Sequence, residues 1–369
     1  MRTSLALTRA ALFAAVVAGC SSLTPGTKTL PDSGSAAPVA PSRAAFETEL
    51  EHAGHDAKAV AIWASNAFFN YLVGMDETGS IAVDSIDVGA NGCLGPNSVK
   101  IDSSRNIWVA CFTNQSGETS GSLEQEYSSG GSLLRSFKWT TPCPQTATIC
   151  GAFSNDGGPD RSGHVFSEMN GSYLQNNKPY MMEDGFFWWP ADRPNAAPKF
   201  IGLGTSCSPI CQPLNMDTDK SGNIWFTFQG SGHPCCSGLG EVTNPTTKPR
   251  VLVVLAPGTY KFGRGVFTSD GGATLNVVDS GVRKIYQYRL PLTPASKPFN
   301  TLGPTATGLS AALGQPNTGG FNRAETKIAI GDYGGWVNLG TVASNRWTAK
   351  LSMQLLPQPV SAAYTPSDR

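Results

Sequence analysis

The sequence predicts an all-β protein built from repeated units of short strands. A seven-residue pattern begins with Asp, has Gly or another turn-forming residue in its middle and, in its three clearest copies, ends on Trp or Phe. It spans Asp102–Trp108 and returns at Asp219–Trp225, and the first residues of five copies lie 58, 59, 51 and 62 positions apart. Such spacing is typical of repeat architectures. Composition agrees, because only 15% of the residues are charged while Gly (41) and Pro (26) are plentiful.

Each copy of the pattern predicts a tight turn between two strands. The Asp carboxylate accepts hydrogen bonds from the backbone that follows it, and Gly or Asn supplies the positive φ of the turn. In one copy, Val99–Asp102 and Ile107–Phe112 flank the turn, and two further strand-like runs follow at Ser122–Tyr127 and Ser132–Trp139. Four short strands with turns between them form one blade of a β-propeller.

The number of repeats predicts about six four-stranded blades, with five or seven as alternatives because the last two copies are degenerate. The equivalent points are Trp63, Trp108, Phe166, Trp225, Asn276 and the region of Trp336. The first unit lacks an innermost strand, so we expect a strand near the C-terminus to complete it and close the ring. The propeller is expected over residues 59–356, followed by a disordered tail at 357–369.

The N-terminus resembles a bacterial lipoprotein signal. Arg2 and Arg9 come before a short apolar run, which ends in Val-Ala-Gly-Cys at positions 17–20. The run is too short to span a bilayer, so residues 1–19 are expected to be a cleaved signal peptide, with an ordinary secretory signal as the alternative. Cys20 would then carry the lipid and anchor the chain in the cell envelope. The outer membrane is favoured, because Ser21 follows Cys20 as in lipoproteins sorted there.

Residues 20–58 are expected to tether the propeller to this anchor. Positions 21–41 are rich in Ser, Thr, Pro, Gly and Ala, a composition that cannot bury a core. One short helix is expected within residues 42–58.

Beyond Cys20 the chain contains eight cysteines, and an even number in an exported protein favours disulfides. The blade register places all eight at one end of the ring, called here the top face, where the loops entering each blade lie. The preferred pairs are Cys93–Cys111 and Cys143–Cys150, and the other four are expected to bridge Cys207 and Cys211 to Cys235 and Cys236. Sequence alone leaves the pairing open. A zinc site formed by the last four cysteines and His233 is the alternative.

Other chemical motifs are weak. Asp217 to Ile224 fits the first eight positions of a calcium-binding loop, but the twelfth position is Phe228 instead of Glu. We therefore interpret this segment as the repeat turn, and keep Asp217, Asp219 and His233 as weak metal candidates. No catalytic residue is assigned, because no nucleophile elbow or phosphate loop is found. No cofactor is predicted, and a divalent metal stays open.

Two further patterns limit the partners. The chain has 27 basic and 27 acidic residues without a basic run, which argues against nucleic acid as a partner. The aromatic block from Asp184 to Trp189 is expected to be an outer strand packed between blades, with stacking on a ligand as the alternative.

The repeat Asp-x-x-Gly-Asn-Ile-Trp, followed by an apolar strand, resembles the repeats of NHL-type propellers. It is also similar to streptogramin B lyase repeats, which share the core seen at Gly222–Thr227. The resemblance covers roughly residues 59–355 and implies the propeller fold. For the lyases it also implies a His base and a divalent metal, although Phe228 stands where those repeats often have Glu.

These observations lead to two functional hypotheses. The first is an exported, lipid-anchored propeller that binds a protein or small ligand at its top face, as a binding or scaffold module without chemistry of its own. The alternative is a metal-dependent enzyme, a lyase or a lactonase-type hydrolase resembling the gluconolactonase family. Its metal would sit in the central channel among Glu, Asp and Asn side chains. Propellers serve many unrelated functions, so the fold does not choose between them.

Overall fold

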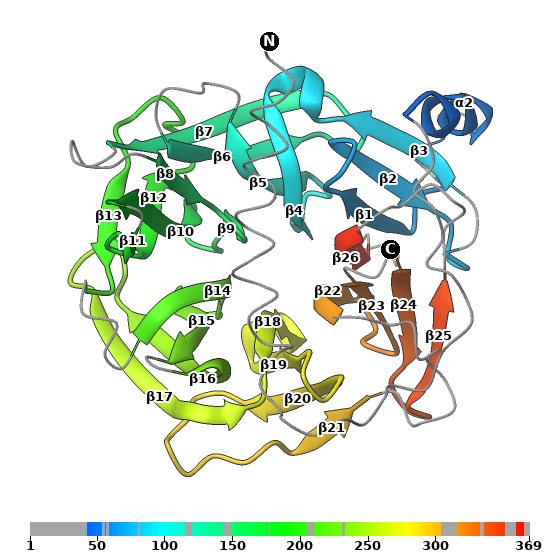
Figure 1. Cartoon of the computed structure of the whole chain (residues 1–369). Coiled ribbons are helices and arrows are strands. Elements are labelled where there is room, and N and C mark those ends of the chain that lie inside the picture. Colours follow the sequence, from blue (N-terminus) through cyan, green and yellow to red (C-terminus); the bar gives the residue numbers. More distant parts are fainter. Residues whose placement is uncertain are drawn as a thin grey trace, which may run out of the picture.

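The computed structural model describes residues 43–53, 56, 59–79, 82–114, 120–142, 149–176, 178–204, 210–230, 233–303, 316–332, 336–350 and 359–364. In this part of the chain the only regular helices are α2 (Arg43–Ala53) and two short 3-10 turns, η1 (Gly89–Asn91) and η2 (Asp270–Gly272). All other elements are strands, which surround a central axis as a ring of sheets (Figure 1). The predicted all-β propeller is therefore confirmed.

The first half of the chain contains β1 (Ile62–Asn66), β2 (Tyr71–Met75), β3 (Ala82–Asp87), β4 (Cys93–Ile101), β5 (Ile107–Asn114), β6 (Ser120–Tyr127), β7 (Leu133–Thr141), β8 (Ile149–Phe153), β9 (Gly157–Pro159), β10 (His164–Gln175), β11 (Lys178–Met181), β12 (Gly185–Pro190) and β13 (Lys199–Gly202). The second half contains β14 (Ile210–Thr218), β15 (Ile224–Gly230), β16 (His233–Thr243), β17 (Arg250–Tyr260), β18 (Gly263–Ser269), β19 (Thr274–Asp279), β20 (Lys284–Arg289), β21 (Asn300–Leu302), β22 (Pro316–Phe321), β23 (Lys327–Asp332), β24 (Trp336–Thr341), β25 (Arg346–Lys350) and β26 (Pro359–Tyr364).

The described strands form five hydrogen-bonded sheets, not the six separate ones that were expected. Three are four-stranded, with the orders β4-β5-β6-β7, β14-β15-β16-β17 and β18-β19-β20-β21. A fourth has the order β11-β10-β12-β13, and β8 and β9 also pair with β10. The fifth has eight strands, β25-β24-β23-β22-β26-β1-β2-β3. Its two halves are joined by a parallel bridge between Thr318 and Ser361, which merges the first and last units of the chain.

The ring is closed by the C-terminal strand, as the sequence predicts. β26 pairs antiparallel with β1, with Trp63 opposite Ala363 and Ala64 opposite Ala362. The expectation of a disordered tail over residues 357–369 is wrong for 359–364. Ala362 is fully buried there, and the unpaired inner edge of β1 finds its hydrogen-bond partner in β26.

The repeat turns are held by their Asp residues, also as predicted. Asp219 Oδ1 accepts hydrogen bonds from the backbone N–H of Ser221 (2.8 Å) and Asn223 (3.0 Å). Its Oδ2 accepts from Trp225 Nε1 at 3.0 Å. Asp102 makes the same indole contact with Trp108 at 3.0 Å. The repeated Trp therefore locks its own turn, which explains why the two residues recur together.

Helix α2 belongs to the folded body instead of a free tether. Phe46 is fully buried, and its ring stacks on Phe69 with centroids 4.8 Å apart. Leu50 joins the same apolar cluster, and α2 lies against β3. The rest of the expected signal and tether lies outside the described residues. Within the described part, no helix is long and apolar enough to cross a membrane.

The aromatic block 184–189 is an outer strand packed between blades, as expected. It forms β12, where Phe186 meets Phe226 of the following sheet at 5.2 Å between ring centroids. Trp189 faces the other way and packs near Phe137 of the preceding sheet at 5.8 Å. Apolar clusters of this kind lie between successive sheets and leave the polar residues to the inner strands.

Candidate functional site

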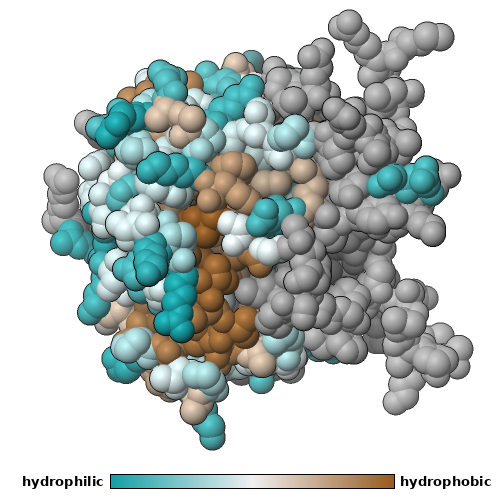
Figure 2. All heavy atoms as spheres, turned by 90° about the vertical axis from the view of Figure 1, so that its left-hand side faces the viewer, coloured by the Kyte–Doolittle hydropathy of each residue, from teal (hydrophilic) through white to brown (hydrophobic). Residues whose placement is uncertain are grey.

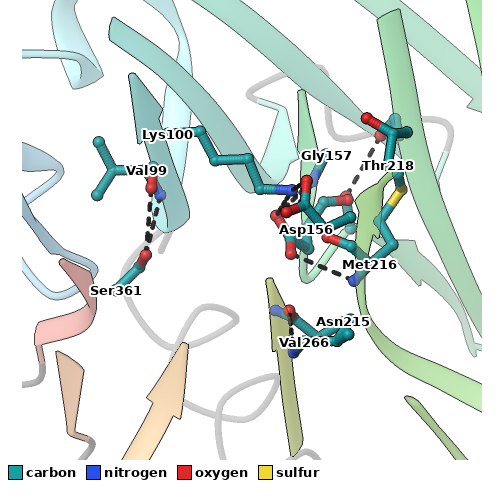
Figure 3. A network of polar contacts seen from close by, with 12 residues as sticks. Val99, Lys100, Asp156, Gly157, Asn215, Met216, Thr218, Val266 and Ser361 are labelled. Atoms are coloured by element: carbon teal, nitrogen blue, oxygen red, sulfur yellow. Dashed lines mark hydrogen bonds and ion pairs between the residues drawn. The ribbon is translucent and has the colours of Figure 1, made fainter. Parts of the chain in front are cut away.

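The inner strands around the axis carry a polar network that crosses from one sheet to the next (Figure 3). Its centre is Lys100 on β4. The Lys100 Nζ atom lies 3.2 Å from Asp156 Oδ1 and 3.4 Å from Asp217 Oδ1, and it donates to the Met216 carbonyl at 2.7 Å. Asp156 is fully buried, whereas the side chains of Lys100 and Asp217 keep 20% and 17% exposure. We call Lys100, Asp156 and Asp217 the inner ion cluster.

The carboxylates of the inner ion cluster bind the backbone of neighbouring strands. Asp156 accepts hydrogen bonds from the N–H of Gly157 (2.7 Å) and Met216 (3.2 Å). Asp217 Oδ2 accepts from the Thr268 N–H at 2.6 Å and from its hydroxyl at 2.9 Å. The cluster thus ties β4, β9, β14 and β18 together.

Neutral side chains continue the same pattern around the axis. Asn215 Oδ1 accepts from the Val266 N–H at 2.9 Å, and Ser361 Oγ accepts from the Val99 N–H at 3.1 Å (Figure 3). Ser361 thereby connects the closing strand β26 to β4. These contacts link inner strands that belong to different sheets.

A second group, the amide–carboxylate cluster, consists of Asn97, Asn155, Glu168 and Asn170. Glu168 Oε1 accepts from Asn155 Nδ2 at 3.2 Å and from Asn170 Nδ2. Asn97 Nδ2 donates to Asn155 Oδ1 at 3.0 Å. Glu168 is fully buried and Asn170 is 1% exposed. Among the described residues, Glu168 Oε2 and Asn170 Oδ1 have no hydrogen-bond partner, so buried acceptor oxygens are left over here.

Glu124 on β6 is a third buried acid. Ser154 Oγ donates to Glu124 Oε1 at 3.5 Å, and Oε2 has no partner among the described residues. The carboxyl group lies directly over Gly157, where any Cβ would collide with it. Gly157 therefore provides the space in which Glu124 is enclosed.

Burial dominates the electrostatics of these groups. It raises the pKa of Glu124 and of Glu168 well above the ordinary value of 4.5, and the nearby Asp156 adds to both shifts. Burial also raises the pKa of Asp156, against the opposing attraction of Lys100. Burial disfavours the charged Lys100, yet Asp156 and Asp217 raise its pKa on balance. The centre of the ring therefore combines the Lys100 ammonium, whose pKa is raised by its acidic partners, with Glu124 and Glu168, whose pKa values burial holds well above the ordinary value.

Asp184 joins two sheets farther out. It accepts from the backbone N–H of Gly171 at 2.9 Å and of Gln212 at 3.2 Å, which connects β10 to β14. Burial raises its pKa from 3.8 to about 7, although both hydrogen bonds favour the charged form. The sequence singled out Asp184 only as the start of the aromatic block.

The two Asp residues kept as metal candidates serve different networks. Asp219 uses both oxygens on its own turn, including Asn223 Nδ2 at 3.2 Å, while Asp217 belongs to the inner ion cluster. The structure does not bring them together on a shared site. Over the described ranges, no group of three or more His, Cys, Asp or Glu is arranged to hold a metal.

Of the predicted disulfides, Cys93–Cys111 is confirmed, with an S–S distance of 2.11 Å between β4 and β5. Cys20, Cys143 and Cys207 lie outside the described residues. The remaining candidates lie on described strands, but their side chains are not described: Cys150, Cys211, His233, Cys235 and Cys236. Their pairing, and the zinc alternative, stay predictions.

Sequence reasoning missed Lys100, Asp156, Glu124 and Glu168. A usable signal exists for two of them. Lys100 and Glu124 interrupt runs expected to be strands, and strands enclosed between blades leave little water for a charge. An enclosed charge needs a partner, but the chain does not reveal which one, because the partners lie on other sheets.

Comparison with known proteins supports the architecture alone. No protein-family model matches the sequence, and no curated protein matches it. A chain in a crystal structure of a nidogen/laminin complex is similar over 84% of this chain and 100% of its own, with a TM-score of 0.50 and 12% identity. A hypothetical selenium-binding protein from Sulfolobus tokodaii is similar over 80% of this chain and 73% of its own, with a TM-score of 0.51 and 10% identity. At these identities the likeness establishes a β-propeller and nothing of its activity.

Proposed function

We propose that this chain is an exported, lipid-anchored propeller of six blades that acts as a binding or scaffold module. The eight-stranded sheet supports the blade count, because β26-β1-β2-β3 and β22-β23-β24-β25 are each four-stranded units joined by one bridge. Export and lipidation rest on the signal that ends at Cys20.

The binding role is supported by the contacts that the charged side chains of the inner strands make. Lys100, Asp156 and Asp217 bond to one another and to backbone groups of adjacent strands. A catalytic acid or base needs a free position facing a substrate, whereas these groups are committed to holding the ring. The Cys93–Cys111 disulfide also joins β4 to β5. A rigid ring stabilised in this way is suited to presenting loops to a partner at the top face.

The first experiment measures divalent metal in the chain, folded under oxidising conditions and purified without chelator. A metal-free protein without turnover of lactone or lyase substrates supports the binding module. One calcium, magnesium or zinc ion per chain that survives dialysis refutes it in this simple form.

Anchoring is tested separately. The wild-type chain should fractionate with bacterial membranes, and Cys20→Ser should release it. A wild-type chain that is already soluble contradicts the lipid anchor.

A second candidate, a metal-dependent lyase or hydrolase, is favoured by the amide–carboxylate cluster. The orphaned Glu168 Oε2 and Asn170 Oδ1 atoms are hard oxygen donors of the type that calcium and magnesium prefer. If a cation binds there, calcium or magnesium should raise the melting temperature of the wild type and not that of Glu168→Gln. Glu51→Gln, an exposed change on α2, is the matched control and should retain the response. No response in the wild type contradicts this candidate.

A further inference from the structure

Two neighbouring turns of the sheet β18-β19-β20-β21 carry a concentration of positive charge. Residues 260–264 connect β17 to β18, and residues 280–284 connect β19 to β20. We call these two segments the basic turn pair. Together they contain no acidic residue and four basic ones: Lys261, Arg264, Arg283 and Lys284. The described turns 66–70 and 88–92 at the same end of the ring contain no charged residue, so the charge is particular to this sheet.

The course of the chain places the basic turn pair at the top face. Residues 260–264 form the loop that enters the sheet, β18 runs away from that end and β19 returns to it. The turn between β19 and β20 therefore lies beside the entering loop, and the Ser280 N–H donates to the Phe262 carbonyl at 2.9 Å. The Lys261 side chain covers Gly281, where an added Cβ would lie 2.9 Å from the lysine Cγ. The two turns thus form one continuous surface.

A buried acid holds the two turns together. Asp279 is 2% exposed and accepts hydrogen bonds from the backbone N–H groups of Lys261 and Phe262, both at 2.9 Å. Its Oδ1 atom also accepts from the Gly281 N–H at 3.0 Å. Successive backbone N–H groups in a turn are what a phosphate would bind, and here Asp279 already occupies them. The surface therefore offers side-chain cations instead of a preformed phosphate site.

The cations of the basic turn pair have no acidic partners in the described part of the chain. Lys261 and Lys284 are exposed and Arg283 is partly buried, and none of the three forms an ion pair with a described residue. The outer wall of the ring differs. Figure 2 shows apolar side chains between polar ones on the side where β13 lies, and next to β13 the exposed Arg193 has Asp192 at 3.7 Å. Uncompensated positive charge at the top face is complementary to an anionic partner.

The backbone at Arg283 is an independent indication. Its φ is 56°, in the left-handed region that Gly adopts without strain and that Asn tolerates. Asn occupies this region at Asn70, Asn244 and Asn345. An Arg in the same conformation lowers stability, and strained residues of this kind are concentrated at functional sites. The position therefore keeps a guanidinium group where a smaller residue would fold more easily.

We propose that the basic turn pair binds an acidic segment of a partner protein. An extended acidic chain distributes its carboxylates over several residues, as the cations here are distributed over two turns. Val282 is 40% exposed between them, and the Arg264 guanidinium lies 5.3 Å from the centre of the Phe262 ring, so apolar groups of the partner would also find contacts. Anionic membranes are recognised by longer basic segments or amphipathic helices, which two short turns do not resemble. This inference rests on the proposed binding role and names the kind of partner.

Fluorescence anisotropy of a labelled octaglutamate peptide with the full chain tests the proposal. The wild type should bind at about 50 mM salt and bind more weakly at about 200 mM, because salt screens exposed charges. Lys261→Gln combined with Arg283→Gln should weaken binding about tenfold, since each exposed ion pair contributes a factor of up to about five. Lys248→Gln combined with Arg250→Gln is the matched control. It removes the same two charges from exposed positions at the opposite end of the ring and should leave the affinity unchanged.

Arg283→Gly separates a binding role from a structural one. This variant should weaken octaglutamate binding several-fold and yet raise the melting temperature by about 2 °C, because Gly adopts the positive φ without strain. A structural role for Arg283 predicts the reverse. A lower melting temperature with unchanged binding therefore overturns the proposal.

Three other results overturn it as well. They are a wild type that does not bind octaglutamate at low salt, equal losses in the two double variants, and binding to phosphatidylglycerol vesicles without binding to octaglutamate. None of them changes the metal content or the turnover that test the proposed binding role, so the two failures are distinguishable.

Discussion

Glu124→Gln tests whether the buried acids at the centre of the ring are held protonated. The substitution keeps the shape of the side chain and removes its ability to ionise. In the folded chain, burial raises the pKa of Glu124 well above 4.5, whereas the unfolded chain has an ordinary carboxyl. Above pH about 4.5 the unfolded state therefore loses a proton that the folded state keeps, and the free energy of unfolding falls as pH rises.

The magnitude follows from proton linkage. The difference in unfolding free energy between Glu124→Gln and the wild type should grow by about 1.4 kcal/mol for each pH unit above about 4.5, as long as the folded carboxyl stays protonated. Below the ordinary pKa the two proteins should differ little.

Urea unfolding at several pH values between about 4 and 8 measures the effect, with the denaturant slope checked at each pH. Glu51→Gln on the surface of α2 is the control and should run parallel to the wild type. If Glu124→Gln also runs parallel to the wild type, the Glu124 carboxyl ionises as readily in the folded protein as in water, and the reasoning is refuted.

Three further perturbations test the framework. Lys100→Met should lower the unfolding free energy by about 3 kcal/mol, because Asp156 is left as a buried charge without its cation, and adding Asp156→Asn should restore at least part of this loss in the same urea assay. Gly157→Ala should cost about 1–3 kcal/mol because its Cβ collides with the Glu124 carboxyl group, whereas Gly130→Ala, whose nearest neighbour would be 3.8 Å away, should be close to neutral; equal effects would contradict the packing argument. Replacing both Cys93 and Cys111 by Ser opens a loop with a sequence separation of 18 and should cost about 3 kcal/mol, and a melting temperature equal to that of the wild type would contradict a stabilising role for the bridge.

The local structure of the repeats could be predicted from the sequence, because its causes lie within a few residues. The Asp219 turn, its Gly222 with φ of 79° and the strands on either side all follow from neighbouring side chains. The aromatic strand β12 and the Cys93–Cys111 pair were predicted as well, since β4 and β5 are consecutive strands and both cysteines lie toward the same end of their blade.

Contacts between sheets could not be read in this way. Lys100, Asp156 and Asp217 come from three different sheets, and nothing within a repeat indicates that they meet. The tail was misjudged for the same reason. Pro359–Tyr364 is a strand only because β1, almost 300 positions earlier in the chain, offers it an edge and buries its alanines.

The sequence by itself determined the repeating turn, the strands that flank it and therefore an all-β ring, because these depend on short-range hydrogen bonds and on the alternation of apolar residues. The tertiary structure decided which polar groups meet at the axis and how the first and last units merge into one sheet. These features arise from the closure of the ring, which places residues from distant repeats within hydrogen-bond distance and removes water from between them.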